Sequence, residues 1–198
     1  MENTVLTKSF PPPEIQRKEI KRYLGVKESD QKIEDLIEEV ITKTQNSFTY
    51  SVCFLELPVK LEANTVTLGD LELVSQALAK NLKGCQRAII FGATVGIGVD
   101  KLIAKYSRLS PSRAVVIDAF ATERIESLCD EFCLDLSQNL KLRPRFSAGY
   151  GDLKLECQRD IIAMLDCQRR IGLTLNESLL MSPSKSVTAI VGIEKRGF

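Results

Sequence analysis

The segment 48–54 alternates strictly between large apolar residues and small or polar ones. The apolar set is Phe48, Tyr50, Val52 and Phe54, and the set between them is Thr49, Ser51 and Cys53. Successive side chains of a strand point to opposite faces, so this alternation predicts a strand with one buried face. Half-buried strands are typical of an antiparallel sheet that is covered on one side.

Helical patterns are interleaved with this strand and with further strand-like segments. Proline and glycine punctuation and apolar spacing predict helices at 11–24, 30–44, 73–82, 100–106, 110–136 and 155–170, and strands at 65–68, 87–91 and 186–193. Several strands are amphipathic, which disfavours a parallel doubly wound sheet. We therefore predict an α+β fold with a twisted, mainly antiparallel sheet and helices, formed by a single domain over residues 1–198.

The composition argues against nucleic-acid-binding, secreted and membrane proteins. The 27 Lys and Arg residues nearly balance the 26 Asp and Glu residues, for a net charge of +1, so no basic field for nucleic acid is expected. The sequence shows no signal-peptide pattern and no apolar stretch of membrane-spanning length, which predicts a soluble cytoplasmic protein without a membrane partner. Its six cysteines are far apart and are expected to be reduced thiols.

The chain contains no histidine. This absence excludes a Ser-His-Asp triad, a Cys-His pair and a histidine-based zinc site. Hydrolase functions that depend on these groups are therefore not expected. We also expect no catalytic side chain and no metal ligand.

Arg145-Phe-Ser-Ala-Gly149-Tyr150 joins a fixed cation, a glycine and an aromatic ring within one short polar segment. A guanidinium binds a carboxylate bidentately, and the backbone beside a glycine can approach a flat ring closely. The segment therefore suits a small zwitterionic ligand. The alternative is a turn that only links two packed elements.

The helix predicted at 110–136 carries Glu126 on a stripe of mostly small or apolar residues, namely Val115, Ala119, Thr122, Cys129 and Cys133. An unpaired buried carboxylate is costly, so Glu126 should meet an arginine, backbone amides or a ligand. An internal ion pair with a structural arginine is one of these possibilities. Asp118 raises the same question, while Cys129 and Cys133 lack the further ligands that a metal site needs.

A second pattern favours another class of protein. The run from Ala88 to Gly98, with Gly92, Gly96 and Gly98, is similar to the glycine turn of short-chain dehydrogenases, and Tyr150-x-x-x-Lys154 has their catalytic spacing. The order and spacing of these motifs in the chain do not fit that family, however, and no acidic residue follows the turn where a ribose is held. Packing of the turn against the sheet is the simpler interpretation of the glycines.

The C-terminal motifs together resemble the activation domain of cobalamin-dependent methionine synthase. The resemblance rests on Arg145 to Tyr150, then Leu175-Asn-Glu-Ser-Leu-Leu-Met181-Ser-Pro183, then Ser186-Val-Thr-Ala-Ile190, in the same order. The long helix with Asp118, Ala119 and Glu126 is similar too. The likeness covers residues 85–193, and residues 1–84 form an N-terminal part of helices and strands.

The resemblance implies a free-standing module that binds S-adenosylmethionine (AdoMet) and supports reductive methylation of cob(II)alamin. The cobalamin would be carried by a partner, such as a methionine synthase lacking its activation domain, with a flavodoxin-like or other reductant as electron donor. By matching position, Arg145 would bind the methionyl carboxylate, and Ser147, Ala148 and Gly149 would offer backbone hydrogen bonds. Tyr150 would pack beside the ligand, and Glu126 would be a ligand-site acid.

The sequence also departs from this family. Phe146 stands where the family has proline, a tyrosine of the family's ligand site has no evident counterpart, and the sequence given ends at Phe198, before the family's tail. These departures motivate an alternative, a non-enzymatic docking protein that contacts a corrinoid methyltransferase without binding AdoMet.

Overall fold

The computed structural model describes residues 4–28 and 30–194. Within these ranges one sheet has the strand order β4-β3-β2-β5-β9-β6, with β1 beside β2, and every strand pairing is antiparallel. The bounds are β1 Leu6–Ser9, β2 Ser51–Glu62, β3 Thr65–Leu68, β4 Leu71–Val74, β5 Arg87–Thr94, β6 Lys141–Leu142 and β9 Ser186–Glu194, and a separate hairpin pairs β7 Thr174–Leu175 with β8 Met181–Ser182. The predicted α+β class and antiparallel sheet are confirmed.

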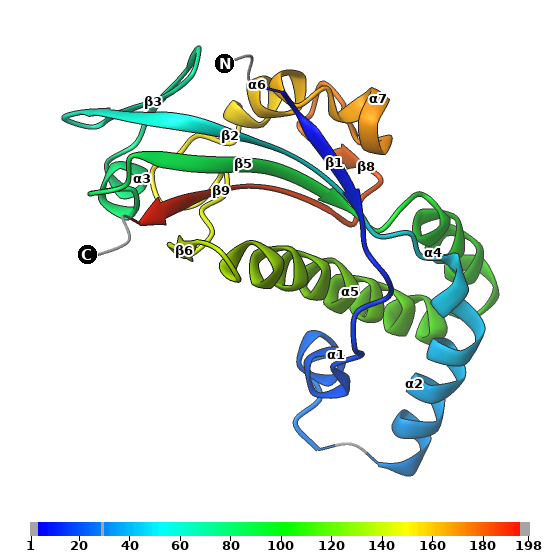
Figure 1. Cartoon of the computed structure of the whole chain (residues 1–198). Helices are drawn as coiled ribbons and strands as arrows, with labels where there is room; N and C mark the ends of the chain where they lie inside the picture. The colour runs from blue at the N-terminus through cyan, green and yellow to red at the C-terminus, as the bar shows by residue number, and fades with distance from the viewer. Residues whose placement is uncertain (1–3, 29, 195–198) are drawn as a thin grey trace.

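Helices lie on both faces of this sheet. They are α1 Arg17–Tyr23, α2 Gln31–Thr44, α3 Gln76–Asn81, α4 Gly98–Leu109, α5 Pro111–Ser137, α6 Cys157–Met164 and α7 Cys167–Ile171, with a 3-10 turn at Gln45–Ser47. Figure 1 shows α5 running beneath the sheet, α6 and α7 on the opposite face, and α1 and α2 beyond α5. The sheet is therefore covered on both faces, and α5 lies between the sheet and the N-terminal helices.

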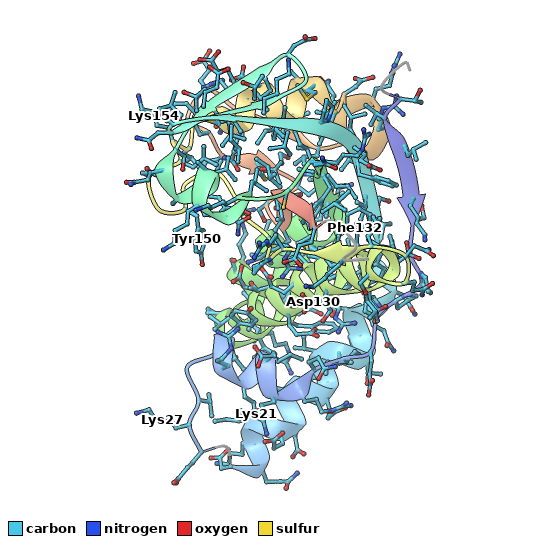
Figure 2. All side chains as sticks on the ribbon, turned by 60° about the vertical axis from the view of Figure 1, so that its left-hand side comes forward. Lys21, Lys27, Asp130, Phe132, Tyr150 and Lys154 are labelled. Atoms are coloured by element: carbon cyan, nitrogen blue, oxygen red, sulfur yellow. The ribbon has the colours of Figure 1, made fainter. Side chains whose placement is uncertain are left out.

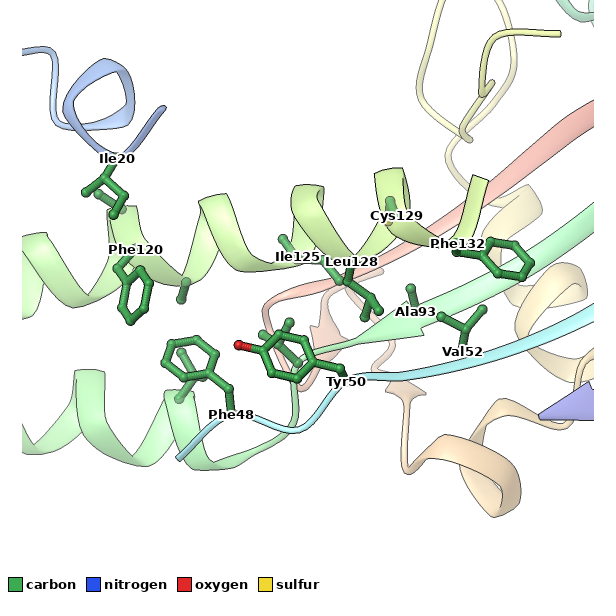
Figure 3. Packing of buried hydrophobic residues seen from close by; sticks show 14 of the residues in the cluster. Ile20, Phe48, Tyr50, Val52, Ala93, Phe120, Ile125, Leu128, Cys129 and Phe132 are labelled. Carbon is green, nitrogen blue, oxygen red and sulfur yellow. The ribbon is translucent and has the colours of Figure 1, made fainter. Parts of the chain in front are cut away.

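The larger core forms between α5 and the sheet. The Phe132 ring contacts Phe91 of β5 and Phe54 of β2 at centroid distances of 4.9 and 5.1 Å, and Phe120 contacts Phe48 at 5.0 Å. Figure 3 shows the Phe120 ring of α5 facing the Phe48 ring, with Phe132 farther along the same helix. Burial of large aromatic rings contributes strongly to core stability, so these contacts fix the position of α5 along the sheet.

The second core lies on the other face of the sheet. Leu78 of α3, Leu165 and Cys167 are all fully buried there against Ile90 and Ile190 of the two central strands. The central strands β5 and β9 are thus buried on both sides, which explains why 87–91 reads as a continuous apolar run rather than an alternating one.

The helix predicted at 73–82 is wrong in its first part. Leu71 and Leu73 are buried while Glu72 and Val74 are exposed, and the four residues form β4 against β3. The helix begins only after Ser75, whose side chain accepts a hydrogen bond from the Leu78 N–H as an N-cap.

Two other predicted helices have different bounds. The helix predicted at 155–170 is two helices, α6 and α7, because Asp166 adopts the left-handed conformation at φ 48° between them. The helix predicted from residue 11 begins only at Arg17. The carbonyls of Pro13 and Glu14 instead accept hydrogen bonds from Arg124 at 2.6 and 2.7 Å, so this stretch is held in an extended form.

The strand predicted at 48–54 begins at Ser51 and extends to Glu62 through Pro58. On the side of β2 away from β5, β1 pairs with residues as far as Phe54 and β3 pairs from Val59 onward. Pro58 therefore lies between these two neighbours, where its missing N–H costs the sheet no bond on that side.

The glycine turn at the start of α4 packs against the segment that leads into β2, so close packing accounts for these glycines. A Cβ on Gly98 would lie 2.3 Å from the Ser47 carbonyl oxygen, and one on Gly96 would lie 2.2 Å from the Thr49 hydroxyl. Gly96 also has φ at +85°. Close backbone approach therefore accounts for both glycines without a bound phosphate.

In the part of the chain that the structure describes, none of the helices has the length and apolar character needed to cross a bilayer.

We predict that Gly98→Ala destabilises the protein by about 1–3 kcal/mol, because the added methyl group collides with a backbone carbonyl that cannot swing away. At an uncrowded helix position, glycine to alanine would stabilise by up to about 1 kcal/mol, so the sign of the change tests the contact. Urea denaturation measures it. Lys101→Ala at an exposed position of α4 is the control and should change stability by less than about 0.5 kcal/mol. A stabilised Gly98→Ala variant would contradict the packing.

Candidate ligand-binding site at the edge of the sheet

One face of α5 carries four polar residues at four-residue intervals, Asp118, Thr122, Glu126 and Asp130. Residues four apart in a helix lie one above the other, so the four form a line that we call the acidic seam. Two cations from the C-terminal third of the chain pair with this seam. Lys185 Nζ lies 2.8 Å from Asp118, and the Arg145 guanidinium contacts both Glu126 and Asp130.

Arg145 reaches the seam because the next residue is fixed to the sheet. Phe146 and Ile190 of β9 exchange two backbone hydrogen bonds, at 2.9 and 2.8 Å, which continue the sheet by one isolated bridge. Arg145 then places Nη2 3.2 Å from Glu126 and Nη1 2.9 Å from Asp130. The structure thus brings together Glu126 and Arg145, two residues that the sequence marked for one site.

A tight turn follows Arg145. Gly149 adopts φ +84°, a conformation that favours glycine, and its N–H donates to the Leu153 carbonyl at 2.8 Å. The Tyr150 N–H donates to the Ser147 carbonyl at 3.1 Å. Gly149 therefore uses its own N–H inside the turn, and Ser147 uses its carbonyl there.

Asp152 fastens this turn to the start of α3. Its carboxylate accepts hydrogen bonds from the Ser75 hydroxyl at 2.5 Å and from the N–H groups of Gln76 and Ala77 at 2.8 and 3.1 Å. The hydrogen bond from Ser75, followed by those from the two amides, lowers the pKa of Asp152 below its ordinary value. The turn is therefore held at one end by the β9 bridge and at the other by α3.

Tyr150 stands outside these contacts. Its side chain is 70% exposed, and its ring meets Phe146 edge-on at a centroid distance of 6.4 Å. In Figure 2 it projects from the upper part of the molecule, above the level of Asp130 on α5. An exposed aromatic ring at this place is free to stack on a ligand.

Two hollows flank the contact between Arg145 and the seam. One, of about 200 Å³, lies between α5 and α1 and is lined by Glu126, Asp130, Tyr23 and Glu19 among others. The other, of about 420 Å³, lies toward β6 and is lined by Asp130, Arg145, Arg143 and Leu142 among others. Asp130 lines both. The site is therefore a pair of open hollows that share Asp130, rather than a closed cavity, and we call the two together the groove.

Glu126 meets an arginine, as expected, but its expected burial is wrong. Its side chain is 44% exposed, and Val115 on the same predicted stripe is also exposed. The buried acid of α5 is Glu123, only 1% exposed, and it pairs with the equally buried Arg124. The stripe chosen from the sequence runs along the boundary of the buried face, where acids are easily solvated.

The Glu123–Arg124 pair is completed by the N-terminal arm. Glu123 also accepts hydrogen bonds from the Gln16 N–H at 3.0 Å and the Ser127 hydroxyl at 2.7 Å, while Arg124 donates to the carbonyls of Pro13 and Glu14. Buried charges are tolerated when their hydrogen-bonding capacity is used in this way. The network fixes α1 on α5, and so places Tyr23 beside Glu126.

The two thiols on α5 lie beneath Arg145. Burial raises the pKa of Cys133, and the Arg145 guanidinium only partly offsets that rise. Burial raises the pKa of Cys129 even further above its ordinary value. Both thiols are therefore protonated at neutral pH and act as packing groups at the base of the site.

The sequence interpretation missed Asp130, Tyr23 and Lys185 as members of this site. Asp130 follows Glu126 by four residues, so the helical spacing alone was enough to find it. Tyr23 had no such pattern. Burial raises its pKa, and the charge of Glu126 adds to the rise, which is consistent with its place across the groove from α5.

A comparison with solved structures agrees with this architecture. No family model and no curated protein matches the sequence. Among solved structures, the crystal structure of the MetH reactivation domain bound to AdoHcy is similar, with a TM-score of 0.70 and 11% identity over 99% of this chain and 81% of that one. The chain has the fold of the MetH reactivation domain. The fold expected from the resemblance to methionine synthase is thereby confirmed.

The reactivation-domain fold leaves little support for the dehydrogenase alternative. The described sheet has only antiparallel pairings, whereas a dinucleotide-binding turn needs parallel strands joined through a helix. Figure 2 also shows Lys154 well apart from Tyr150, so the two do not form a catalytic pair.

We predict that Arg124→Met lowers the free energy of unfolding by about 3–5 kcal/mol, because it leaves Glu123 buried without its counter-charge. Chemical denaturation followed by circular dichroism measures the loss. The double variant Glu123→Gln, Arg124→Met should regain most of it, since no buried charge then remains. Lys8→Ala, which breaks a half-exposed pair with Asp135, is the control and should cost less than about 1 kcal/mol. Equal effects of Lys8→Ala and Arg124→Met would disprove the role of burial.

Proposed function

We propose that this chain binds AdoMet in the groove between α5 and the segment 145–150. The observation that carries the proposal is the Arg145 guanidinium, held at the sheet edge between the acids of α5 and the Gly149 turn, in a fold shared with a domain that was crystallised with AdoHcy. A single small site offers a cation for a carboxylate and an acid for an ammonium group.

In this proposal, different residues bind different parts of AdoMet. Arg145 binds the methionyl carboxylate, and Glu126 balances the α-ammonium group. Ser147 and Ala148 offer backbone contacts to the heterocycle, and Tyr150 lies against it. These groups position the ligand and take no part in proton transfer, so the chemistry needs no histidine.

AdoMet supplies an activated methyl group, and the acceptor in this proposal is cob(II)alamin on a separate corrinoid protein. The partner is a methionine synthase that lacks its own activation domain, and a flavodoxin-like or other reductant provides the electron for reductive methylation. The cytoplasm is the compartment in which we place this exchange. The chain acts as an accessory module, and its own part is to hold the methyl donor in place.

A second candidate function has one observation in its favour. Both terminal nitrogens of Arg145 already contact acids of α5, which is the arrangement expected of a structural arginine. In this alternative the chain docks on a corrinoid methyltransferase and binds no AdoMet.

We predict that AdoMet binds the wild-type chain and that Arg145→Ala weakens binding about 10- to 100-fold, which is the loss expected for a charged hydrogen bond. AdoHcy should lose affinity to the same degree, because it has the same amino-acid end. Isothermal titration calorimetry measures both. Arg87→Ala is the matched control, since Arg87 is an exposed arginine of β5 paired with Glu56. No AdoMet binding by the wild type, alone or with a corrinoid partner, would refute the proposal.

The two candidate functions also differ in how the partner binds. For an AdoMet-dependent module, the affinity for a cobalamin-loaded methionine synthase without its activation domain should rise when AdoMet is present, and Arg145→Ala should abolish that rise. For a docking protein, the affinity should be the same with and without AdoMet. Biolayer interferometry on the immobilised chain distinguishes the two.

A further inference from the structure

One terminal nitrogen of the Arg145 guanidinium donates a hydrogen bond, and the other does not. Nη2 donates a hydrogen bond to Glu126 at 3.2 Å. Nη1 is buried and lies 2.9 Å from an oxygen of Asp130, yet that contact lacks hydrogen-bond geometry, and within the described residues Nη1 has no other acceptor. A buried donor without an aligned acceptor is costly, so a better-aligned acceptor at this nitrogen would be favourable.

Asp130 is the weaker of the two acids on Arg145. Its side chain is 73% exposed, against 44% for Glu126. It is also the residue that lines both hollows, whereas Glu126 lines only the hollow on the α1 side. Asp130 is therefore the partition between the hollows, and its side chain is mostly in water.

We propose that Asp130 is an internal competitor for the carboxylate of the ligand. It occupies Arg145 Nη1 when the groove is empty, and the ligand carboxylate displaces it and supplies the aligned hydrogen bonds that Asp130 does not. This inference rests on the proposed function in one respect, because it assumes that Arg145 receives a carboxylate.

The exchange has a small cost and a structural consequence. An ion pair with a largely exposed partner contributes little, so displacing Asp130 lowers ligand affinity by only about two- to fivefold. When Asp130 turns toward solvent, the partition opens and the two hollows become one groove along α5. That groove extends on one side to Tyr23 of α1 and on the other to Leu142 and Arg143 near β6.

Asp130 and Glu126 then have opposite effects on binding. Glu126 keeps its contact with Arg145 and faces the ammonium group, so its loss weakens binding. Asp130 competes for the same cation as the ligand, so its loss strengthens binding. If both acids simply attracted a positively charged ligand, removing either acid would lower the affinity for that ligand.

The first test measures AdoMet and AdoHcy affinity by calorimetry for Asp130→Asn and Glu131→Gln. Glu131 is the adjacent exposed acid of α5, so its variant makes the same charge change beside the site. Asp130→Asn should tighten binding of both ligands about two- to fivefold, and Glu131→Gln should leave affinity within about 1.5-fold of wild type. Weaker binding by Asp130→Asn would overturn the proposal and make Asp130 a ligand contact. Equal tightening by both variants would show a general charge effect and would also overturn it.

The second test needs no AdoMet, so it remains informative if the proposed function fails. Phenylglyoxal modifies accessible guanidinium groups, and peptide mass spectrometry gives the rate at each arginine. In Asp130→Asn, Arg145 should be modified at least twice as fast as in wild type, with Arg87 as the internal reference and Glu131→Gln as the control. An unchanged rate at Arg145 would refute the masking of this arginine by Asp130. A faster rate without AdoMet binding by any variant would sustain the masking and reject only the ligand.

Discussion

Phe132 packs where α5 crosses the sheet, and its ring contacts Phe10, Phe54 and Phe91 from three separate segments. Interdigitated rings of this size leave a helix little freedom to slide or roll, because a shift opens cavities on one side and causes collisions on the other. The angular position of every other residue on α5 follows from this contact. It directs the acidic seam toward the edge of the sheet, and it directs Glu123 and Arg124 toward the N-terminal arm.

The opposite side of α5 is fixed by charge rather than by apolar contact. Glu123 and Arg124 bind backbone groups of the extended arm before α1, so this interface has directional bonds that only one register of the arm satisfies. Apolar packing alone would tolerate several placements of such a short helix. A seven-residue helix is too short to be stable by itself, and here its position depends on the buried pair.

The sequence was sufficient for the elements whose pattern has a single interpretation. The strand at 65–68, the helix at 30–44 and the helix at 110–136 match the observed β3, α2 and α5 closely, because periodicity and end signals agree there. The segment 73–82 failed because apolar residues in a short strand followed by a short capped helix can mimic one helical stripe. The segment 155–170 failed because a left-handed aspartate is not a residue that a pattern identifies as a break.

The sequence likewise predicted some residues of the site and missed others. Arg145 and Glu126 were found from residue type and order in the chain, and the structure brings them into contact. The burial of Glu126 was misjudged because tertiary contacts decide which face of a helix is buried. Glu123, three residues earlier, is only about 60° away around the helix axis. Helical spacing from Glu126 was enough to find Asp130, whereas Tyr23 and Lys185 come from two other segments that only the fold brings to this site. The acids of the seam belong to residues 118–130, and the cations that pair with them, Arg145 and Lys185, come from a later part of the chain. A molecule held between these two parts binds only the folded chain, so by mass action it must raise the global stability and slow the exchange of amides far from the groove.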